Sequence, residues 1–260
     1  MTLILKNLQN NILTITLNRP EKYNSFTEPM ALELQDALQE AESESVRCVV
    51  IKSSGKAFCG GQDLPEVVQK AENSAYKLSD TVNTSYNPII TKIRNLPKPV
   101  ICAVQGTAAG AGANIAIACD IVIASSQAIF IQAFSKIGLV PDSGGTWFLP
   151  RLIGFARANA FYMLDEKITA DKAVEIGLIY KSVDPDQLEA EIEKTAIYLA
   201  SMPTKGFALY KKAVNRSLSN SLKDQLKLEA ELQSEAGMSR DYKEGVQAFM
   251  EKRAAKFQGS

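Results

Sequence analysis

Three loops in this 260-residue chain combine glycine with polar groups, and these are the segments where chemistry is most readily placed. The first loop, residues 56–64, contains the pair Gly60–Gly61 just after a short apolar run. Glycines leave backbone N–H groups open to a ligand, and donors aimed at one oxygen would form an oxyanion hole. A plain tight turn would explain the same pair, and for an isolated Gly-Gly it is the favoured interpretation.

The second loop, residues 106–113, runs through small residues into a predicted helix. Free N–H groups and the positive end of the helix dipole at such a point hold an anion or a developing negative charge. Close packing of the helix on a sheet would favour the same small residues. The pattern fits both explanations equally well.

The third loop, residues 137–147, contains the carboxylate of Asp142 directly after Pro141. Apolar surroundings raise the pKa of a carboxyl group toward the range of a general base. An N-cap for the next helix is the alternative interpretation, and on spacing alone it is the simpler one.

The sequence contains no histidine, which excludes Ser-His-Asp catalysis, Cys-His catalysis and histidine-based zinc sites. Neither a dinucleotide-binding G-x-G-x-x-G nor a P-loop pattern occurs, and we expect no metal site. Lysine plus arginine equals aspartate plus glutamate at 29 each, so nothing in the net charge favours a nucleic-acid partner. The four cysteines lack C-x-x-C spacing and are expected to be reduced thiols of a cytoplasmic protein.

The elements that must position these loops follow from the apolar pattern. Residues 12–17 alternate like a strand, Thr27 is placed to cap a helix, and residues 48–51 form a short buried run. Residues 100–119 carry no charge, but Gln105–Gly106 interrupts them, so we expect a strand, a loop and a helix and no membrane span. We therefore predict an α/β core over residues 1–195 and a helical region over residues 196–260.

Taken together and in this order, the three loops resemble those of the crotonase, or enoyl-CoA hydratase/isomerase, superfamily. The resemblance extends from Leu13-Thr14-Ile15-Thr16-Leu17-Asn18-Arg19-Pro20 to Phe249-Met250-Glu251-Lys252-Arg253. It implies a spiral of ββα turns, a helical C-terminal region that builds a homotrimer or a dimer of trimers, and an acyl-CoA thioester as substrate. No cofactor is expected, because coenzyme A is part of the substrate.

The resemblance also assigns roles to residues. It places the two oxyanion-hole donors on Gly60 and Ala111, and coenzyme A near Lys22, Phe58, Gln62, Asp63 and Leu64. Phe249 and Lys252 match residues that reach a neighbouring subunit's coenzyme A, and the alternative is an amphipathic terminal helix with Phe249 inside and Lys252 in solvent. The expected acyl pocket consists of Asn114, Phe134, Ile137 and Trp147, of which the apolar members are also candidates for the core.

Departures from the family pattern narrow the expected reaction. Hydratases of the superfamily carry two glutamates that activate water, and the corresponding positions here are Asn114 and Phe134, which do not move protons at neutral pH. The family's dehalogenases need a histidine. The remaining carboxylate, Asp142, stands where several isomerases place an aspartate, so we expect it to shuttle a proton within one substrate.

Several segments, among them Ser85-Tyr86-Asn87-Pro88, are most similar to isomerases that convert ring-1,2-epoxyphenylacetyl-CoA into the oxepin thioester in phenylacetate degradation. A shift from 3-enoyl-CoA to 2-enoyl-CoA is the related reaction. The alternatives are a general Δ3,Δ2-enoyl-CoA isomerase of fatty-acid oxidation, a weakly active hydratase, and an RNA-binding or structural homologue.

Overall fold

The computed structural model describes residues 2–260 and contains one large and one small β-sheet. The large sheet has the order β1-β2-β3-β4-β6-β9, in which β1 is antiparallel to β2 and all other neighbours are parallel. The small sheet has the order β5-β7-β8. The strands are β1 (Ile4–Gln9), β2 (Ile12–Leu17), β3 (Cys48–Ser53), β4 (Val100–Val104), β5 (Ala108–Ala109), β6 (Ile121–Ser125), β7 (Ile129–Ile131), β8 (Ile168–Thr169) and β9 (Lys181–Val183).

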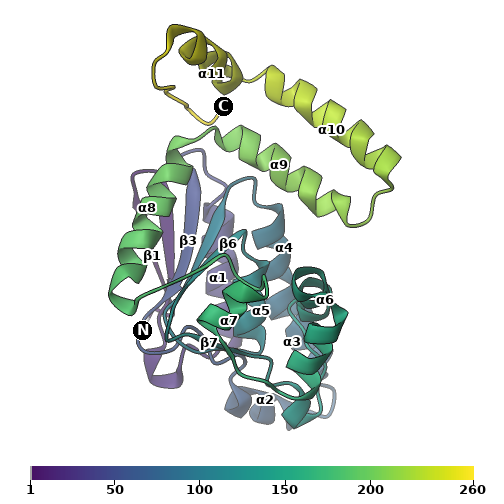
Figure 1. The fold of residues 1–260 in the computed structure, drawn as a ribbon. Coiled ribbons are helices and arrows are strands. Elements are labelled where there is room, and N and C mark those ends of the chain that lie inside the picture. The colour runs from purple at the N-terminus through teal and green to yellow at the C-terminus, as the bar shows by residue number, and fades with distance from the viewer. Residues whose placement is uncertain (1) are drawn as a thin grey trace.

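Helices cover both faces of the large sheet, with α1 and α4 on one face and α8 on the other (Figure 1). Short 3-10 turns include η1 (Pro20–Lys22) and η3 (Ser135–Ile137), and a π-helical turn, η2 (Val82–Tyr86), precedes α4. The α-helices are α1 (Glu28–Glu40), α2 (Leu64–Ala71), α3 (Leu78–Thr81), α4 (Asn87–Asn95), α5 (Ala111–Ala118), α6 (Gly145–Met163), α7 (Ala170–Glu175), α8 (Leu188–Ser201), α9 (Thr204–Ser217), α10 (Leu222–Gly237) and α11 (Arg240–Glu251).

Alternate residues of the central strands belong to two different cores. Val49 and Ile51 of β3 pack with residues of α1, α4 and α5, whereas Cys48 and Val50 pack with residues of α8. Because both faces of the sheet are covered, these strands are continuous apolar runs rather than alternating ones. This explains why the short run at residues 48–51 predicts a strand correctly.

The chain winds through repeated strand-strand-helix units. β4 leads through β5 to α5, and β6 leads through β7 to α6, so each unit adds one strand to each sheet. β3 leads to α2 through Cys59, which forms a parallel bridge with Ala108 of β5. This arrangement confirms the expected spiral of ββα turns, and it places the loops that follow the parallel strands together.

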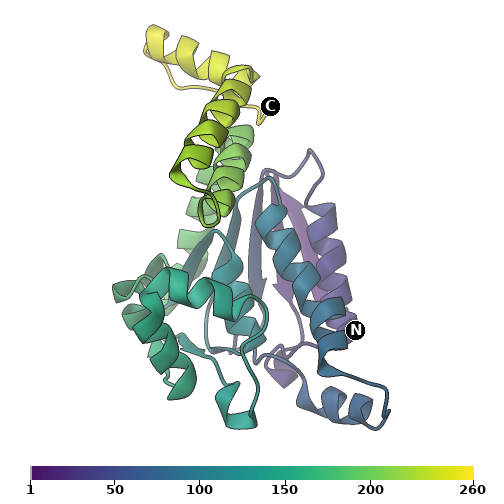
Figure 2. The ribbon, with the colours of Figure 1, turned by 90° about the vertical axis from the view of Figure 1, so that its right-hand side faces the viewer.

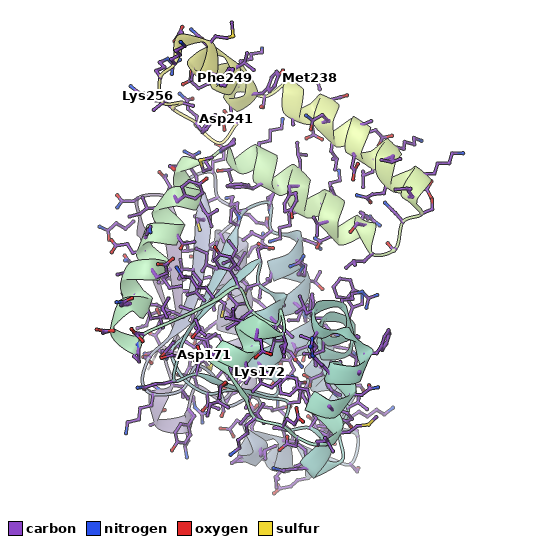
Figure 3. The ribbon with its side chains drawn as sticks, viewed as in Figure 1. Asp171, Lys172, Met238, Asp241, Phe249 and Lys256 are labelled. Atoms are coloured by element: carbon purple, nitrogen blue, oxygen red, sulfur yellow. The ribbon has the colours of Figure 1, made fainter. Side chains whose placement is uncertain are left out.

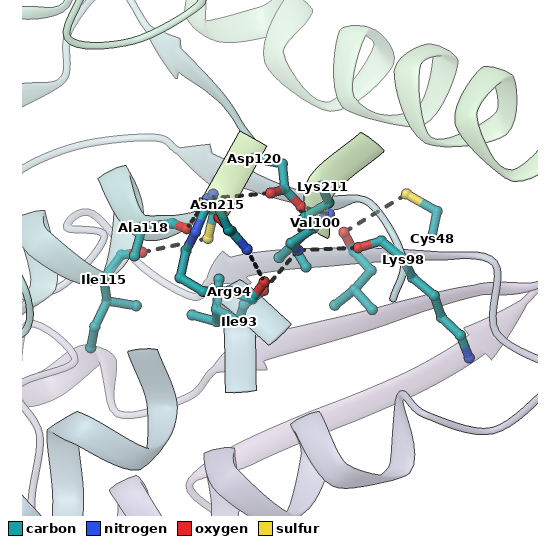
Figure 4. A network of polar contacts seen from close by, with 12 residues as sticks. Cys48, Ile93, Arg94, Lys98, Val100, Ile115, Ala118, Asp120, Lys211 and Asn215 are labelled. Atoms are coloured by element: carbon teal, nitrogen blue, oxygen red, sulfur yellow. Dashed lines mark hydrogen bonds and ion pairs between the residues drawn. The ribbon is translucent and has the colours of Figure 1, made fainter. Parts of the chain in front are cut away.

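The last three helices, α9 to α11, extend beyond the body of the protein as an arm (Figure 2). A partly buried polar network between α9 and the core attaches the arm (Figure 4). In that network Nζ of Lys211 donates to Oδ2 of Asp120 at 2.6 Å, and the same carboxylate oxygen accepts from the backbone of Val100 at 2.9 Å. Arg94 and Asn215 also join α4 to α9.

Most expected elements are present, with local differences. Residues 100–119 form a strand, a loop and a helix, and no helix within residues 2–260 has the length and apolar composition needed to cross a bilayer. Thr27 stands at the N-cap of α1, but its side chain makes no capping hydrogen bond. The expected boundary between residues 195 and 196 falls inside α8, which packs on the sheet.

Candidate active site

The first and second glycine loops lie against each other after the ends of β3 and β4. The backbone of Phe58 donates to Thr107 at 3.0 Å, and the backbone of Ala109 donates to Cys59 at 2.8 Å. A Cβ added at Gly112 would lie 2.6 Å from Sγ of Cys59, so only glycine allows this approach. Burial raises the pKa of the Cys59 thiol to about 12, which excludes a thiolate nucleophile here at neutral pH.

The free backbone donors of these loops are not those expected. The N–H of Gly60 donates to the carbonyl of Tyr23 at 2.8 Å and is therefore occupied. Within residues 2–260, the N–H groups of Gln62 and Ala111 have no acceptor. Gln62 replaces Gly60 as the candidate donor, whereas Ala111 keeps that role.

Local geometry explains why these two N–H groups are free and close together. Gln62 forms a parallel bridge with Phe26, and in such a bridge the residue's own N–H points away from its partner. Ala111 is the first residue of α5, where the N–H lacks an intrahelical acceptor. Between them lies Gly61, with φ +90°, whose ideal Cβ position is 3.7 Å from the nitrogen of Ala111.

The third loop carries Asp142, which is partly buried between η3 and α6. Burial raises the pKa of Asp142, and a hydrogen bond from Oγ of Ser143 at 2.9 Å opposes that rise in part. The interpretation of Asp142 as a helix cap is wrong, because Gly144 is the N-cap of α6 and no side chain caps it. Its carboxylate is thus not engaged at the helix N-terminus.

The backbone of Asp142 is held from two sides. Its carbonyl accepts from the backbone of Gly145 at 2.8 Å and from Nδ2 of Asn114 at 2.9 Å. Asn114 is fully buried on α5, one turn after Gly110, to whose carbonyl its own N–H donates. This contact connects the start of α5, where Ala111 lies, to the loop that carries the carboxylate.

Two buried polar residues near the loops were not identified from the sequence. Gln132 follows β7 and donates from Nε2 to Oδ1 of Asn114 at 3.1 Å. Tyr86 ends the π-helical turn and packs edge-on against Phe26, with ring centroids 6.1 Å apart. Burial first, and then the charge of Asp142, raise the pKa of Tyr86, which remains a neutral phenol. The only sequence signal for Gln132 is a lone amide beside an apolar strand.

The residues expected around coenzyme A differ in how accessible they are. Phe58 is fully buried and belongs to the core. Asp63 caps α2 and forms an ion pair with Arg19 at 2.7 Å; although burial opposes it, this contact lowers the pKa of Asp63. Lys22 and Leu64 are exposed at the rim of the first loop. Nε2 of the Gln62 side chain is buried without a partner in the described part of the chain.

The residues expected in the acyl pocket are only partly brought together. The ring of Phe134 lies 3.7 Å from the ideal Cβ position of Gly110, beside the start of α5. Ile137 is largely exposed. Trp147 packs edge-on against Phe148 and lies beneath the guanidinium of Arg151, lining a separate cavity of about 300 Å³.

The two expected C-terminal contacts lie far from these loops within one chain. Phe249 projects from α11 in the arm, away from the body of the protein that contains α7 (Figure 3), and is 81% exposed. Lys252 is the exposed C-cap of the same helix. Neither residue approaches the glycine loops of its own chain.

The chain is similar over nearly its whole length to proteins of one family. The enoyl-CoA hydratase/isomerase family model matches residues 7–260. The chain is 44% identical over 260 residues to the 1,2-epoxyphenylacetyl-CoA isomerase of Escherichia coli (strain K12), which covers all of this chain and 99% of that protein. It is 46% identical over 252 residues to a probable enoyl-CoA hydratase of Rhodobacter capsulatus, covering 97% of this chain and 96% of that one.

A third relative and a solved structure extend the similarity. The chain is 37% identical over 257 residues to the trans-2-decenoyl-[acyl-carrier-protein] isomerase of Streptococcus mutans, covering 98% of each protein. The crystal structure of an enoyl-CoA hydratase from Polaromonas sp. JS666 superposes with a TM-score of 0.91 at 32% identity, covering 98% of this chain and 99% of that one.

Proposed function

The chain belongs to the enoyl-CoA hydratase/isomerase family, and from this premise we propose that it isomerises coenzyme A thioesters with Asp142 as the group that moves the proton. Family membership supports a hydratase or isomerase activity on acyl-CoA thioesters. One observation carries the finer proposal. Asp142 is a partly buried carboxylate with a raised pKa, whereas Asn114 and Phe134 stand at the two positions expected to hold a hydratase's glutamates.

In the proposed reaction, the N–H groups of Gln62 and Ala111 bind the thioester oxygen. Removal of a proton from the carbon next to the thioester places negative charge on that oxygen. Two fixed N–H groups stabilise this charge more than they stabilise the neutral carbonyl, and each such donor contributes about 3 kcal/mol to the transition state. Their freedom from other acceptors and their closeness at Gly61 support this role.

Asp142 then acts as base and as acid in turn. Its carboxylate takes the proton from one carbon, the electron pair moves into the enolate, and the carboxyl group returns the proton at another carbon. A raised pKa makes the carboxylate a stronger base. The reaction consumes no water, oxidant or reductant, so it needs no cofactor beyond the coenzyme A of the substrate.

For the substrate, we propose ring-1,2-epoxyphenylacetyl-CoA, with the oxepin thioester as product and the 3-enoyl to 2-enoyl shift as a second reaction. The relative from Escherichia coli, similar over the whole of both chains, supports this choice. The buried ring of Phe134 beside Gly110 gives the neighbourhood of the thioester an apolar, aromatic wall.

A second candidate is a general Δ3,Δ2-enoyl-CoA isomerase, which the decenoyl isomerase from Streptococcus mutans favours. Hydration is the third, because the relative from Rhodobacter capsulatus carries that name. Purified protein given the ring epoxide, an aliphatic 3-enoyl-CoA and a 2-enoyl-CoA in separate assays distinguishes them. We expect turnover of the epoxide and of the 3-enoyl thioester. A fast addition of water to the 2-enoyl thioester would overturn the proposal.

We also propose that the protein is a homotrimer or a dimer of trimers, in which Phe249 and Lys252 reach a neighbour's coenzyme A. The arm exposes several large apolar side chains, which is unfavourable in a monomer. They include Tyr210, Leu222, Phe249 and Met250. Sedimentation of the full chain tests the assembly, and a monomer at micromolar concentration would contradict it.

A further inference from the structure

Two side-chain hydrogen bonds connect Gln132, just after β7, through Asn114 of α5 to the backbone carbonyl of Asp142, just before α6. Nε2 of Gln132 donates to Oδ1 of Asn114 at 3.1 Å, and Nδ2 of Asn114 donates to the carbonyl of Asp142 at 2.9 Å. Gln132 is 1% exposed and Asn114 is fully buried. Neither side chain has a task in the proposed proton transfer, so their hydrogen bonds need another explanation.

The direction of these hydrogen bonds is determined by the acceptor at one end. A backbone carbonyl only accepts, so Asn114 must present its amide nitrogen to Asp142 and its oxygen to Gln132. Gln132 must then present its nitrogen. Within residues 2–260 this leaves Oε1 of Gln132 buried and without a partner. An unpaired buried amide oxygen costs about 1–3 kcal/mol, so the orientation is maintained against a penalty.

The backbone that Asn114 holds is strained. Ser143 has φ +50° and Gly144 has φ +76°, both in the left-handed region. A non-glycine residue in such a conformation persists only where its surroundings impose it, at a cost of about 1–3 kcal/mol. A Cβ at Gly145 would lie 2.4 Å from Nδ2 of Asn114, so the amide packs directly on this backbone.

We propose that Gln132 and Asn114 are positioning residues: Gln132 orients the Asn114 amide, and Asn114 fixes the strained backbone that carries Asp142. This inference rests on the proposed role of Asp142 as proton carrier. It assigns a function to the position where an asparagine replaces a hydratase's glutamate. It also adds a residue, Gln132, that acts without touching the substrate.

The test uses the full chain with three substitutions: Asn114→Leu, Gln132→Met and the double variant. Leucine and methionine keep the approximate volume of each amide while removing its hydrogen bonds. We expect Asn114→Leu to lower kcat on a 3-enoyl-CoA roughly 10²-fold, because small displacements of a reacting group have effects of that size. Gln132→Met should lower kcat by about tenfold, and KM should stay within about twofold for both.

Two further readouts separate positioning from a merely structural role. The double variant should match Asn114→Leu alone, since Gln132 acts only through Asn114. In a loosened loop, water reaches Asp142 and part of the burial that raises its pKa is lost. The acid limb of the pH profile, where kcat/KM falls on acidification, should therefore move to lower pH. Gln127→Met, at an exposed site just before β7, is the control and should leave kcat unchanged.

The outcomes distinguish this inference from the proposed function. If the unmodified protein turns over the thioester and Asp142→Asn abolishes that activity, the proposed function holds. If Gln132→Met then keeps its kcat and its acid limb, the positioning role is overturned, whether or not Asn114→Leu folds. If the unmodified protein is inactive on thioesters, or Asp142→Asn is fully active, the proposed function itself fails.

Discussion

The hydroxyl of Ser143 donates a hydrogen bond to Oδ1 of Asp142 at 2.9 Å, and both residues lie in the strained loop before α6. The two contributions to the pKa of Asp142 oppose each other. Burial disfavours the charged carboxylate and raises the pKa, whereas the hydroxyl stabilises the charge and lowers it, with a net rise. Ser143 therefore sets how far the base is raised above an ordinary aspartate.

Replacement of Ser143 by alanine should shift the pH dependence of the reaction. Without the hydroxyl the pKa of Asp142 rises further. Because the base must be ionised, the loss of activity on acidification begins at a higher pH than in the unmodified protein. A pH profile of kcat/KM measures this shift. Ser143→Gly relieves the backbone strain but also lacks the hydroxyl, so it should show the same shift; an unmoved acid limb in both variants would refute the role.

Proline at position 111 should remove one candidate donor. Ala111 is the first residue of α5, where proline is tolerated, and its N–H has no acceptor within the described chain. Loss of an oxyanion-hole donor lowers kcat roughly 10²–10³-fold. Ala111→Ser keeps the N–H and serves as the matched control. Equal kcat values for Ala111→Pro and Ala111→Ser would show that this donor takes no part in catalysis.

A methyl group at Gly145 should disturb the contact between α5 and the Asp142 loop. Its Cβ would lie 2.4 Å from Asn114, and overpacking of this kind destabilises a protein by about 1–3 kcal/mol. Gly237→Ala, at the end of α10 with open space around it, should be neutral or stabilising by up to about 1 kcal/mol. Denaturant unfolding measures both, and equal stabilities would contradict the packing described here.

The network at the base of the arm should depend on Asp120. Burial lowers the pKa of Lys211 while the charge of Asp120 opposes that effect, so removal of the carboxylate leaves the buried ammonium group with the carbonyls of Ile93 and Lys98 but without a charged partner. Asp120→Ala should lower the free energy of unfolding by about 1–3 kcal/mol. Glu175→Ala breaks an exposed pair with Lys172 and should change it by less than about 0.5 kcal/mol. Similar losses in both variants would exclude a special role for the network.

Local patterns in the sequence predicted the strands whose apolar residues are buried in the core. The alternating residues 12–17 and the continuous apolar runs at residues 48–51 and 100–104 all form strands, and the two runs are continuous because both faces of the large sheet are covered there. Strand β1 has no clear apolar pattern, because only its first residue, Ile4, is buried. Strand β9 has none either, because all three of its residues are only partly buried. Neither strand was predicted. Gly154, with φ +77° and ψ 159°, interrupts α6 and divides it into two helical segments.

The candidate site was predictable at the level of loops but not of atoms. Gly60 and Gln62 are two residues apart, and only the tertiary contact with the carbonyl of Tyr23 determines which N–H is occupied. The partner of Gln132 lies 18 residues earlier in the chain, so no local pattern reveals it. Asp142, by contrast, was identified from the resemblance to the family, which places the aspartate of several isomerases at this position, whereas spacing alone favoured a helix cap.

The central claim is that Asp142 carries the proton, and the kcat of Asp142→Asn on a 3-enoyl-CoA tests it most directly. The absorbance of the conjugated product follows the reaction, and asparagine keeps the shape of the side chain without its acid-base function. We predict a kcat lowered roughly 10²–10⁴-fold, with KM close to that of the unmodified protein. Turnover of Asp142→Asn at the unmodified rate would contradict the claim.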